Sequence, residues 1–243
     1  MLAGYQHLLF AGRRLQWDEA AIDLAPDARA VADLPTAVRA RLDRLVAGFC
    51  VAETAVAQHL DPYVARSAAV DPDAHACFAL QQGDERRHAR FFARVADEVL
   101  GLPADRRALA GPAIVGLFED DLPRRAAALA ADADAFGAAV GLYHLVLEGI
   151  VFAIGQDALL DELDALGGAL PGTRAGVARV QGDERWHVGL GVLHLRTLGA
   201  PVDVTEPARR AAAAWGPGIA TVARVDRVLR AHARRVGFVP AAA

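Results

Sequence analysis

Apolar residues recur along four long stretches of the chain at the three- and four-residue spacing of amphipathic helices. Asp71-Pro72-Asp73 combines the proline and acidic residues typical of a helix start, and Gly199 with Pro201 ends the fourth stretch. The spacing therefore predicts an all-α protein, a four-helix bundle with additional helices, whose core helices cover about residues 36–69, 73–101, 134–166 and 173–198.

The remaining segments carry a weaker pattern. Residues 1–34 contain turn-prone pieces and are expected to be irregular. Residues 104–131 predict shorter helical pieces, broken at Gly111-Pro112 and at Pro123. A last helix is expected from about Glu206 to Val236, with an exposed arginine-rich face and a packing role.

Composition supports one helical domain over residues 1–243, because no linker divides the chain. Apolar residues make up 54% and aromatic residues only 6%, which favours packed helices. The formal net charge is −4 and the basic residues are dispersed, so no nucleic-acid partner is expected. The apolar stretch Leu145–Ile154 contains Glu148 and is too short to span a membrane. Cys50 and Cys77 lie in apolar helical patterns, and with no signal peptide they indicate free thiols in the cytoplasm.

One motif occurs twice: Gly-Asp-Glu-Arg-x-His covers residues 83–88 and again 182–187. It places Glu85 three residues before His88, and Glu184 three residues before His187. On a helix this spacing puts both side chains on one face, where a carboxylate and an imidazole can bind one metal ion. Two copies predict either two metal ions or one site built symmetrically from two helices.

Two further glutamates complete the pattern. Glu53 and Glu148 each lie among apolar residues, one in the first and one in the third predicted core helix. Either one alone is more simply explained by an arginine partner or by a side chain that reaches solvent. Together with the repeated motif they give the ligand order of bundles that hold two metal ions. Burying four ionised carboxylates costs several kcal/mol each unless cations accompany them, and two divalent ions would neutralise all four. The predicted ligands are Glu53, Glu85, His88, Glu148, Glu184 and His187.

These residues resemble the ferritin-like di-metal carboxylate proteins, specifically the ligand-binding oxidases related to the ribonucleotide reductase small subunit. The similarity covers about residues 8–195 and includes Leu9–Gly12, Trp17 with 21–23, 52–56, 143–149 and 182–187. It implies a ferritin-like bundle that activates dioxygen at a manganese–iron centre and binds a long-chain fatty acid. The donor types also allow two iron ions. We expect a homodimer.

The resemblance also implies roles for residues outside the metal ligands. In the family, oxygen chemistry joins a valine and a tyrosine as an ether, and these positions are Val56 and Tyr143. Asp183 would accept a hydrogen bond from His88, with Trp17 beyond it. We expect a structural or surface role for Asp84, the equivalent residue of the first motif. In α-helical geometry the five-residue offset does not place Tyr143 on the face of Glu148.

Other interpretations remain open. A ribonucleotide reductase subunit would store a radical on a tyrosine four residues after the first histidine ligand, where this chain has Phe92. A flexible carboxyl-terminal tail of such a subunit is not expected from the ending Phe-Val-Pro-Ala-Ala-Ala. A ferritin-like ferroxidase or metal-storage protein would use a similar site but has no need of Val56 and Tyr143. His144, four residues before Glu148, is expected to line the pocket or the core, with metal ligation as the alternative.

Overall fold

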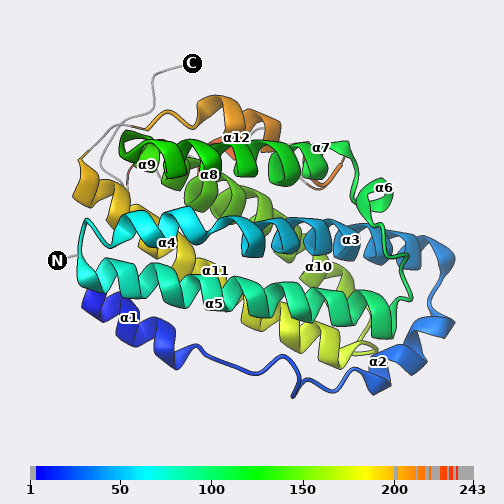
Figure 1. Cartoon of the computed structure of the whole chain (residues 1–243). Helices are drawn as coiled ribbons and strands as arrows, with labels where there is room; N and C mark the ends of the chain where they lie inside the picture. The colour runs from blue at the N-terminus through cyan, green and yellow to red at the C-terminus, as the bar shows by residue number, and fades with distance from the viewer. Residues whose placement is uncertain are drawn as a thin grey trace.

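The structure is a computed structural model that describes residues 4–199, 202–211, 213–216, 219, 225–228, 230, 231 and 234. Every regular element among these residues is helical (Figure 1). Four long helical segments form the bundle and shorter helices cover it. The elements are α1 (Tyr5–Arg14), α2 (Ala25–Ala30), η1 (Val31–Asp33), α3 (Thr36–His59), α4 (Asp61–Ser67), α5 (Pro72–Arg94), η2 (Val95–Val99), α6 (Arg107–Ala110), α7 (Pro112–Val115), η3 (Gly116–Asp121), α8 (Leu122–Ala131), η4 (Ala133–Ala135), α9 (Phe136–Val140), η5 (Gly141–Phe152), α10 (Ala153–Ala165), α11 (Pro171–Leu198) and α12 (Thr205–Ala211).

The four bundle segments lie where the apolar pattern predicts them. The first divides at Leu60 into α3 and α4, because Pro62 at the start of α4 cannot donate the hydrogen bond that would continue α3. The second is α5 with η2, and α5 begins where Asp71 accepts hydrogen bonds from two backbone amides of its first turn. The third runs from η4 through α9 and η5 to α10. The fourth is α11, which ends at Gly199 with a φ of 63°.

The third segment is not a regular α-helix. Residues Gly141–Phe152 form the π-helix η5, and all twelve are buried. Hydrogen bonds in a π-helix join residues five apart, so side chains five apart lie in successive turns on the same side. This stretch contains Tyr143, His144 and Glu148, and the wider turn changes which residues face the bundle interior.

The amino-terminal region is more ordered than the sequence predicts. The expectation of irregular structure over residues 1–34 is wrong for α1 and α2. Helix α1 packs against α5 and α11, and Figure 1 shows it lying along α5. Trp186 of α11 donates a hydrogen bond from Nε1 to the Leu8 carbonyl at 2.6 Å. A Cβ at Gly12 would lie 2.7 Å from the Trp186 ring, so only glycine permits this close approach.

Two other predictions need correction. Pro123 does not break the helix, because the π-helical turn η3 leads directly into α8 and the proline occupies one of its first positions. The expected last helix is interrupted: α12 stops at Ala211, residues 213–215 form a turn, and residues 225–228, 230, 231 and 234 are helical again. Trp215 of this turn is buried and donates a hydrogen bond to the Val151 carbonyl at 2.7 Å. Most of the rest of the expected helix, to Val236, lies outside the described residues.

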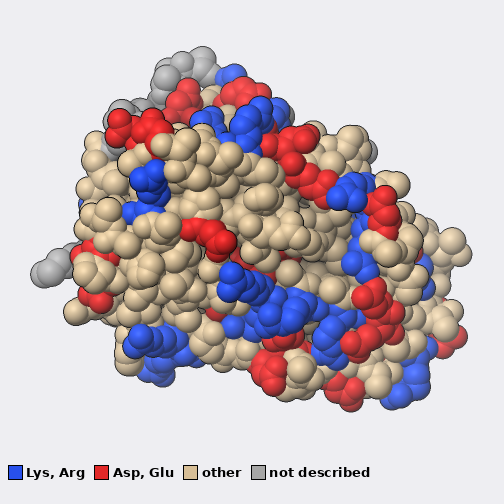
Figure 2. Space-filling model, in the orientation of Figure 1, with Lys and Arg blue, Asp and Glu red and all other residues tan. Residues whose placement is uncertain are grey.

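The apolar helical segment Ala133–Ala165 is long and apolar enough to cross a membrane, with a mean hydropathy of 1.8 in its most apolar window. The sequence argument from length is therefore insufficient. The protein itself buries 83% of that window, as expected for the core helix of a bundle. On the outer surface shown in Figure 2, basic and acidic side chains lie next to one another. Cys50 and Cys77 are free and buried.

Candidate metal centre

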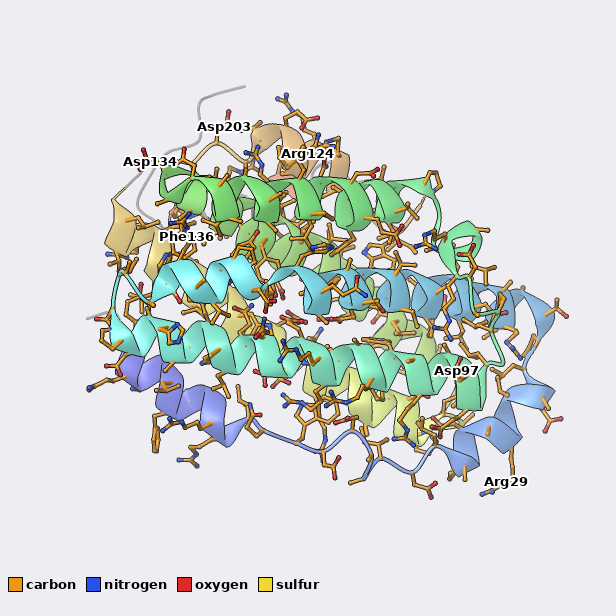
Figure 3. All side chains as sticks on the ribbon, viewed as in Figure 1. Arg29, Asp97, Arg124, Asp134, Phe136 and Asp203 are labelled. Carbon is orange, nitrogen blue, oxygen red and sulfur yellow. The ribbon has the colours of Figure 1, made fainter. Side chains whose placement is uncertain are left out.

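Six side chains from the four bundle segments converge inside the protein. In Figure 3, oxygen and nitrogen atoms gather between α3 and α5, near the middle of α5. Ligand atoms of one group of four residues lie within 4.8 Å of one another, and so do those of a second group. The first group is Glu53, Glu85, His88 and Glu184, and the second is Glu85, Glu148, Glu184 and His187.

Glu85 and Glu184 belong to both groups, which is the arrangement of two carboxylates between two cations. Helix α3 contributes Glu53, the π-helix η5 contributes Glu148, and α5 and α11 each contribute one glutamate–histidine pair. All six side chains are at most 3% exposed. The structure thus brings together every residue that the sequence analysis nominates as a ligand.

Many of the converging atoms have no hydrogen-bond partner. Both carboxylate oxygens of Glu53 and both of Glu148 are without one, as are one oxygen each of Glu85 and Glu184 and the Nδ1 atom of His88. A buried polar atom without a partner costs about 1–3 kcal/mol, and more when it is charged. These unsatisfied atoms belong to residues of the two groups, so a pair of cations fits the donor set.

The pKa values of the two histidines also indicate a site that needs positive charge. Burial alone lowers the pKa of His88, but the hydrogen bond to Asp183 and the nearby carboxylates of Glu184 and Glu85 outweigh it and hold the pKa well above its usual range. The pKa of His187 is raised in the same way, by Glu85 and Glu184 against the effect of burial. Without cations the imidazoles must therefore act as the positive charges of the site.

Each histidine is held by an aspartate from the opposite motif. Nε2 of His88 on α5 lies 3.0 Å from Oδ2 of Asp183 on α11. Nε2 of His187 on α11 lies 3.4 Å from Oδ2 of Asp84 on α5. Trp17 donates to the same Asp183 oxygen from Nε1 at 2.8 Å, the geometry that the family resemblance implies.

The expectation for Asp84 is therefore wrong in part. Asp84 is buried and contacts an imidazole of the site, so it is not a surface residue and its place matches that of Asp183. The sequence argument treated each motif as one helix face and did not consider the neighbouring helix, against which the aspartate of each copy lies.

Arg87 is a site residue that the sequence analysis missed. Its Nη2 atom lies 2.6 Å from Asp84 Oδ1 and 3.0 Å from Asp183 Oδ2, so one buried guanidinium joins the two outer carboxylates. Gln16 accepts a hydrogen bond from Arg87 and donates another to Asp84. The three-residue spacing from Asp84 to Arg87 was a usable signal, because it places the pair on one helix face.

Tyr143 lies beside the ligands. Its hydroxyl donates a hydrogen bond to Glu85 Oε1 at 2.6 Å and accepts one from Gln81 Nε2 at 3.0 Å. The expectation that the five-residue offset keeps Tyr143 away from the face of Glu148 is wrong, because both residues lie in the π-helix. Val56 is fully buried one turn after Glu53 on α3.

His144 and Phe92 bear on the alternative interpretations. His144 is in neither group of ligand atoms, and its Nε2 atom lies 3.0 Å from Gln81 Oε1. Phe92, at the position of a radical-storing tyrosine, is buried and stacks on Phe49 with ring centroids 4.6 Å apart. Gln81 was also missed by sequence reasoning, although its place one turn before Glu85 could have identified it.

No family model matches the chain. Its fold is similar to that of a solved R2-like ligand-binding oxidase with an aerobically reconstituted metal cofactor after photoconversion. The two are 20% identical with a TM-score of 0.75, over 96% of this chain and 80% of that one. A tyrosine-to-phenylalanine variant of such an oxidase with an aerobically reconstituted Mn/Fe cofactor matches at 20% identity and a TM-score of 0.76, over 96% and 84%.

A glycine-to-phenylalanine variant of such an oxidase, with an anaerobically reconstituted Mn/Fe cofactor, matches at 21% identity and a TM-score of 0.75, over 96% of this chain and 86% of that one. These likenesses confirm the all-α, ferritin-like fold that the sequence predicts.

Proposed function

We propose that this protein is a di-metal oxidase that activates dioxygen at a carboxylate-bridged centre. One observation carries the proposal: two groups of buried ligand atoms share Glu85 and Glu184, and both oxygens of Glu53 and of Glu148 have no hydrogen-bond partner. Glu53 and His88 would hold one ion, Glu148 and His187 the other, with the two shared glutamates between them.

The charges balance for two divalent ions. Four carboxylates supply four negative charges, and the two imidazoles can then act as neutral donors. Asp84 and Asp183 would keep each imidazole in the tautomer with hydrogen on Nε2, which leaves Nδ1 free for the ion. Oxygen and imidazole donors suit manganese and iron alike. We propose a manganese–iron pair, as in the solved oxidases of similar fold, with two iron ions as the alternative.

The chemistry proposed for the chain is an ether between Tyr143 and Val56. The O–H bond of Tyr143 and a C–H bond of Val56 break and one C–O bond forms, which removes two protons and two electrons from the protein. A reduced metal pair, when bound, would supply the two further electrons, and solvent the two further protons, that convert one dioxygen to two waters. Glu85 Oε1, 2.6 Å from the Tyr143 hydroxyl, is placed to receive the phenolic proton. Burial keeps the pKa of Tyr143 well above its usual value, so the hydroxyl keeps its proton until this step.

We also propose that a small apolar ligand binds next to the metal centre. Ala52 and Val56 flank Glu53, Leu147 and Val151 lie next to Glu148 along η5, and all four are fully buried aliphatic residues. A long-chain fatty acid suits such surroundings, because its tail is apolar and its carboxylate matches the cations. Solvent extraction followed by mass spectrometry is expected to release about one such ligand per chain. Extracts without any stoichiometric lipid would contradict this part.

A reductase-like radical protein is less well supported. Phe92 occupies the radical position and lies in an aromatic stack with Phe49, and phenylalanine has no hydroxyl hydrogen to lose.

The proposed oxidase is tested by loading the reduced chain with manganese and iron and then admitting air. Intact-protein mass spectrometry is expected to show the loss of two hydrogens, and peptide mapping should place the link between Tyr143 and Val56. A Tyr143→Phe variant is the matched control and should keep its full mass. If the wild-type chain binds two metal ions and consumes dioxygen but the two peptides stay separate, the ether is wrong and only the di-metal site survives.

A further inference from the structure

A line of polar side chains leads from the metal ligands into the core. The Tyr143 hydroxyl lies 2.6 Å from Glu85 Oε1 and 3.0 Å from Gln81 Nε2. The other end of the Gln81 amide, Oε1, lies 3.0 Å from Nε2 of His144. All four side chains have no solvent exposure. Their hydrogen-bond directions are therefore set by one another.

The direction of each bond follows from the ligand at one end. As a metal ligand Glu85 is ionised and can only accept, so the single Tyr143 hydrogen must point at it. The phenol oxygen must then accept from Gln81, which orients the amide with its nitrogen toward the phenol. The amide oxygen consequently faces His144, whose Nε2 must carry a hydrogen. The assignment of both amide and tautomer thus rests on the carboxylate.

We propose that Gln81 and His144 are positioning residues for the reaction at Tyr143. They hold the phenol so that its hydrogen is directed at Glu85 and one lone pair of its oxygen stays free for the new bond. This inference rests on the proposed function, because it concerns the tyrosine of the proposed ether. The hydrogen bond of His144 goes to Gln81 and that of Gln81 goes to Tyr143, so both act through Tyr143.

His144 is itself held in one place. A Cβ at Gly191 would lie 2.2 Å from the His144 Cβ, so His144 packs directly against the backbone of α11 at this glycine. The ring packs edge-on against Phe78, with centroids 5.6 Å apart, and against Tyr143 at 4.5 Å. Burial, together with the nearby His187 and His194, lowers the pKa of His144 to about 3. The ring is therefore neutral at physiological pH and has one hydrogen to donate.

Two variants of equal length separate positioning from packing. In His144→Gln the side-chain amide can place an N–H near the position of Nε2, whereas His144→Met fills a similar volume without a donor. During a single aerobic turnover, we expect the link between Tyr143 and Val56 to form about tenfold more slowly in His144→Met than in wild type. A tenfold slower rate corresponds to the loss of one hydrogen bond of ordinary strength. The glutamine variant should stay within about twofold of wild type. A packing role would slow both variants equally, and that result would overturn the proposal.

Metal content and circular dichroism are measured on the same samples, so that a loading or folding defect is recognised. If His144→Met does not fold, Gln81→Met compared with wild type takes its place. That variant removes the donor to Tyr143 directly, and an unchanged rate of link formation would count against the proposal.

A second measurement does not depend on turnover. Zinc is diamagnetic and has no redox chemistry, and it binds imidazole and carboxylate donors. In the zinc-loaded chain, nitrogen-15 NMR of the His144 ring is expected to show the hydrogen on Nε2. Hydrogen on Nδ1 would reverse the line of bonds and overturn the proposal. If the tautomer is as expected but wild type never forms the link, the proposed ether fails while the orientation of Tyr143 stands.

Discussion

Nε2 of His187 lies 3.4 Å from Oδ2 of Asp84, which is 103 residues earlier in the chain. The reciprocal contact joins His88 to Asp183 at 3.0 Å. Each copy of the repeated motif thus supplies a glutamate–histidine pair of the proposed metal centre and also the carboxylate that contacts the imidazole of the other copy. These two aspartate–histidine contacts connect α5 with α11 at the site.

Asp84→Asn is expected to weaken metal binding about 10- to 100-fold, because a carboxylate that orients a ligating imidazole contributes about that much to affinity. Asp183→Asn should have a similar effect. Affinity is measured by competition with a chelator of known strength. Asp164→Asn, at an exposed ion pair with Arg174, is the control and should bind like wild type. If Asp84→Asn also binds like wild type, the contact with His187 has no role in holding the ion.

Glu53→Ala and Glu148→Ala should each lose one of the two metal ions, since each glutamate belongs to only one group of ligand atoms. Elemental analysis after equilibration with equal manganese and iron measures the stoichiometry. Glu162→Ala, a surface glutamate paired with Arg41, should retain both ions. Two ions bound at wild-type affinity in both site variants would contradict the six-ligand centre.

The sequence was sufficient for the bundle and for the six side chains that converge inside it, because both depend on spacing along single helices. Apolar periodicity located the four long segments, and the three-residue offset located the glutamate–histidine pairs. Glu53 and Glu148 were identifiable because a carboxylate within an apolar run needs a partner.

What the sequence did not predict depends on contacts between elements. Helix α1 is short and docks through Gly12 against Trp186, a contact with no local signature. The role of Asp84 can be predicted only when its contact with the neighbouring helix is known. The side on which Tyr143 lies can be predicted only when the π-helix is known. Tertiary packing selects that wider turn, and α-helical periodicity cannot reveal it.

Arg87 is expected to be a main stabilising residue of the metal-free protein. Its side chain is buried and joins the carboxylates of Asp84 and Asp183. Arg87→Met would leave both without their shared cation, which should lower the free energy of unfolding by about 3–5 kcal/mol. Urea denaturation followed by circular dichroism measures this. Arg174→Met removes an exposed ion pair and should cost less than about 1 kcal/mol. Equal losses in the two variants would show that the buried bridge is not stabilising.

His194 should make the protein less stable in acid. The ring is buried, its Nδ1 lies 2.9 Å from the Tyr5 hydroxyl, and burial lowers its pKa from 6.5 to about 4. The folded state therefore binds this proton less tightly than the unfolded state does. The stability that the neutral ring contributes is fully present above pH 6.5 and is lost as the pH falls toward 4, by about 2 kcal/mol at pH 5.

His194→Asn isolates this contribution, because its side chain offers a polar atom near the position of Nδ1 and does not titrate. Between pH 7.5 and pH 5, the wild-type protein should lose about 2 kcal/mol more unfolding free energy than the variant. Both are measured metal-free, so that release of metal in acid does not add to the difference. His7→Asn, at an exposed position of α1, should show the wild-type loss. Parallel pH profiles for wild type and His194→Asn would mean that the folded protein protonates His194 as readily as the unfolded chain does.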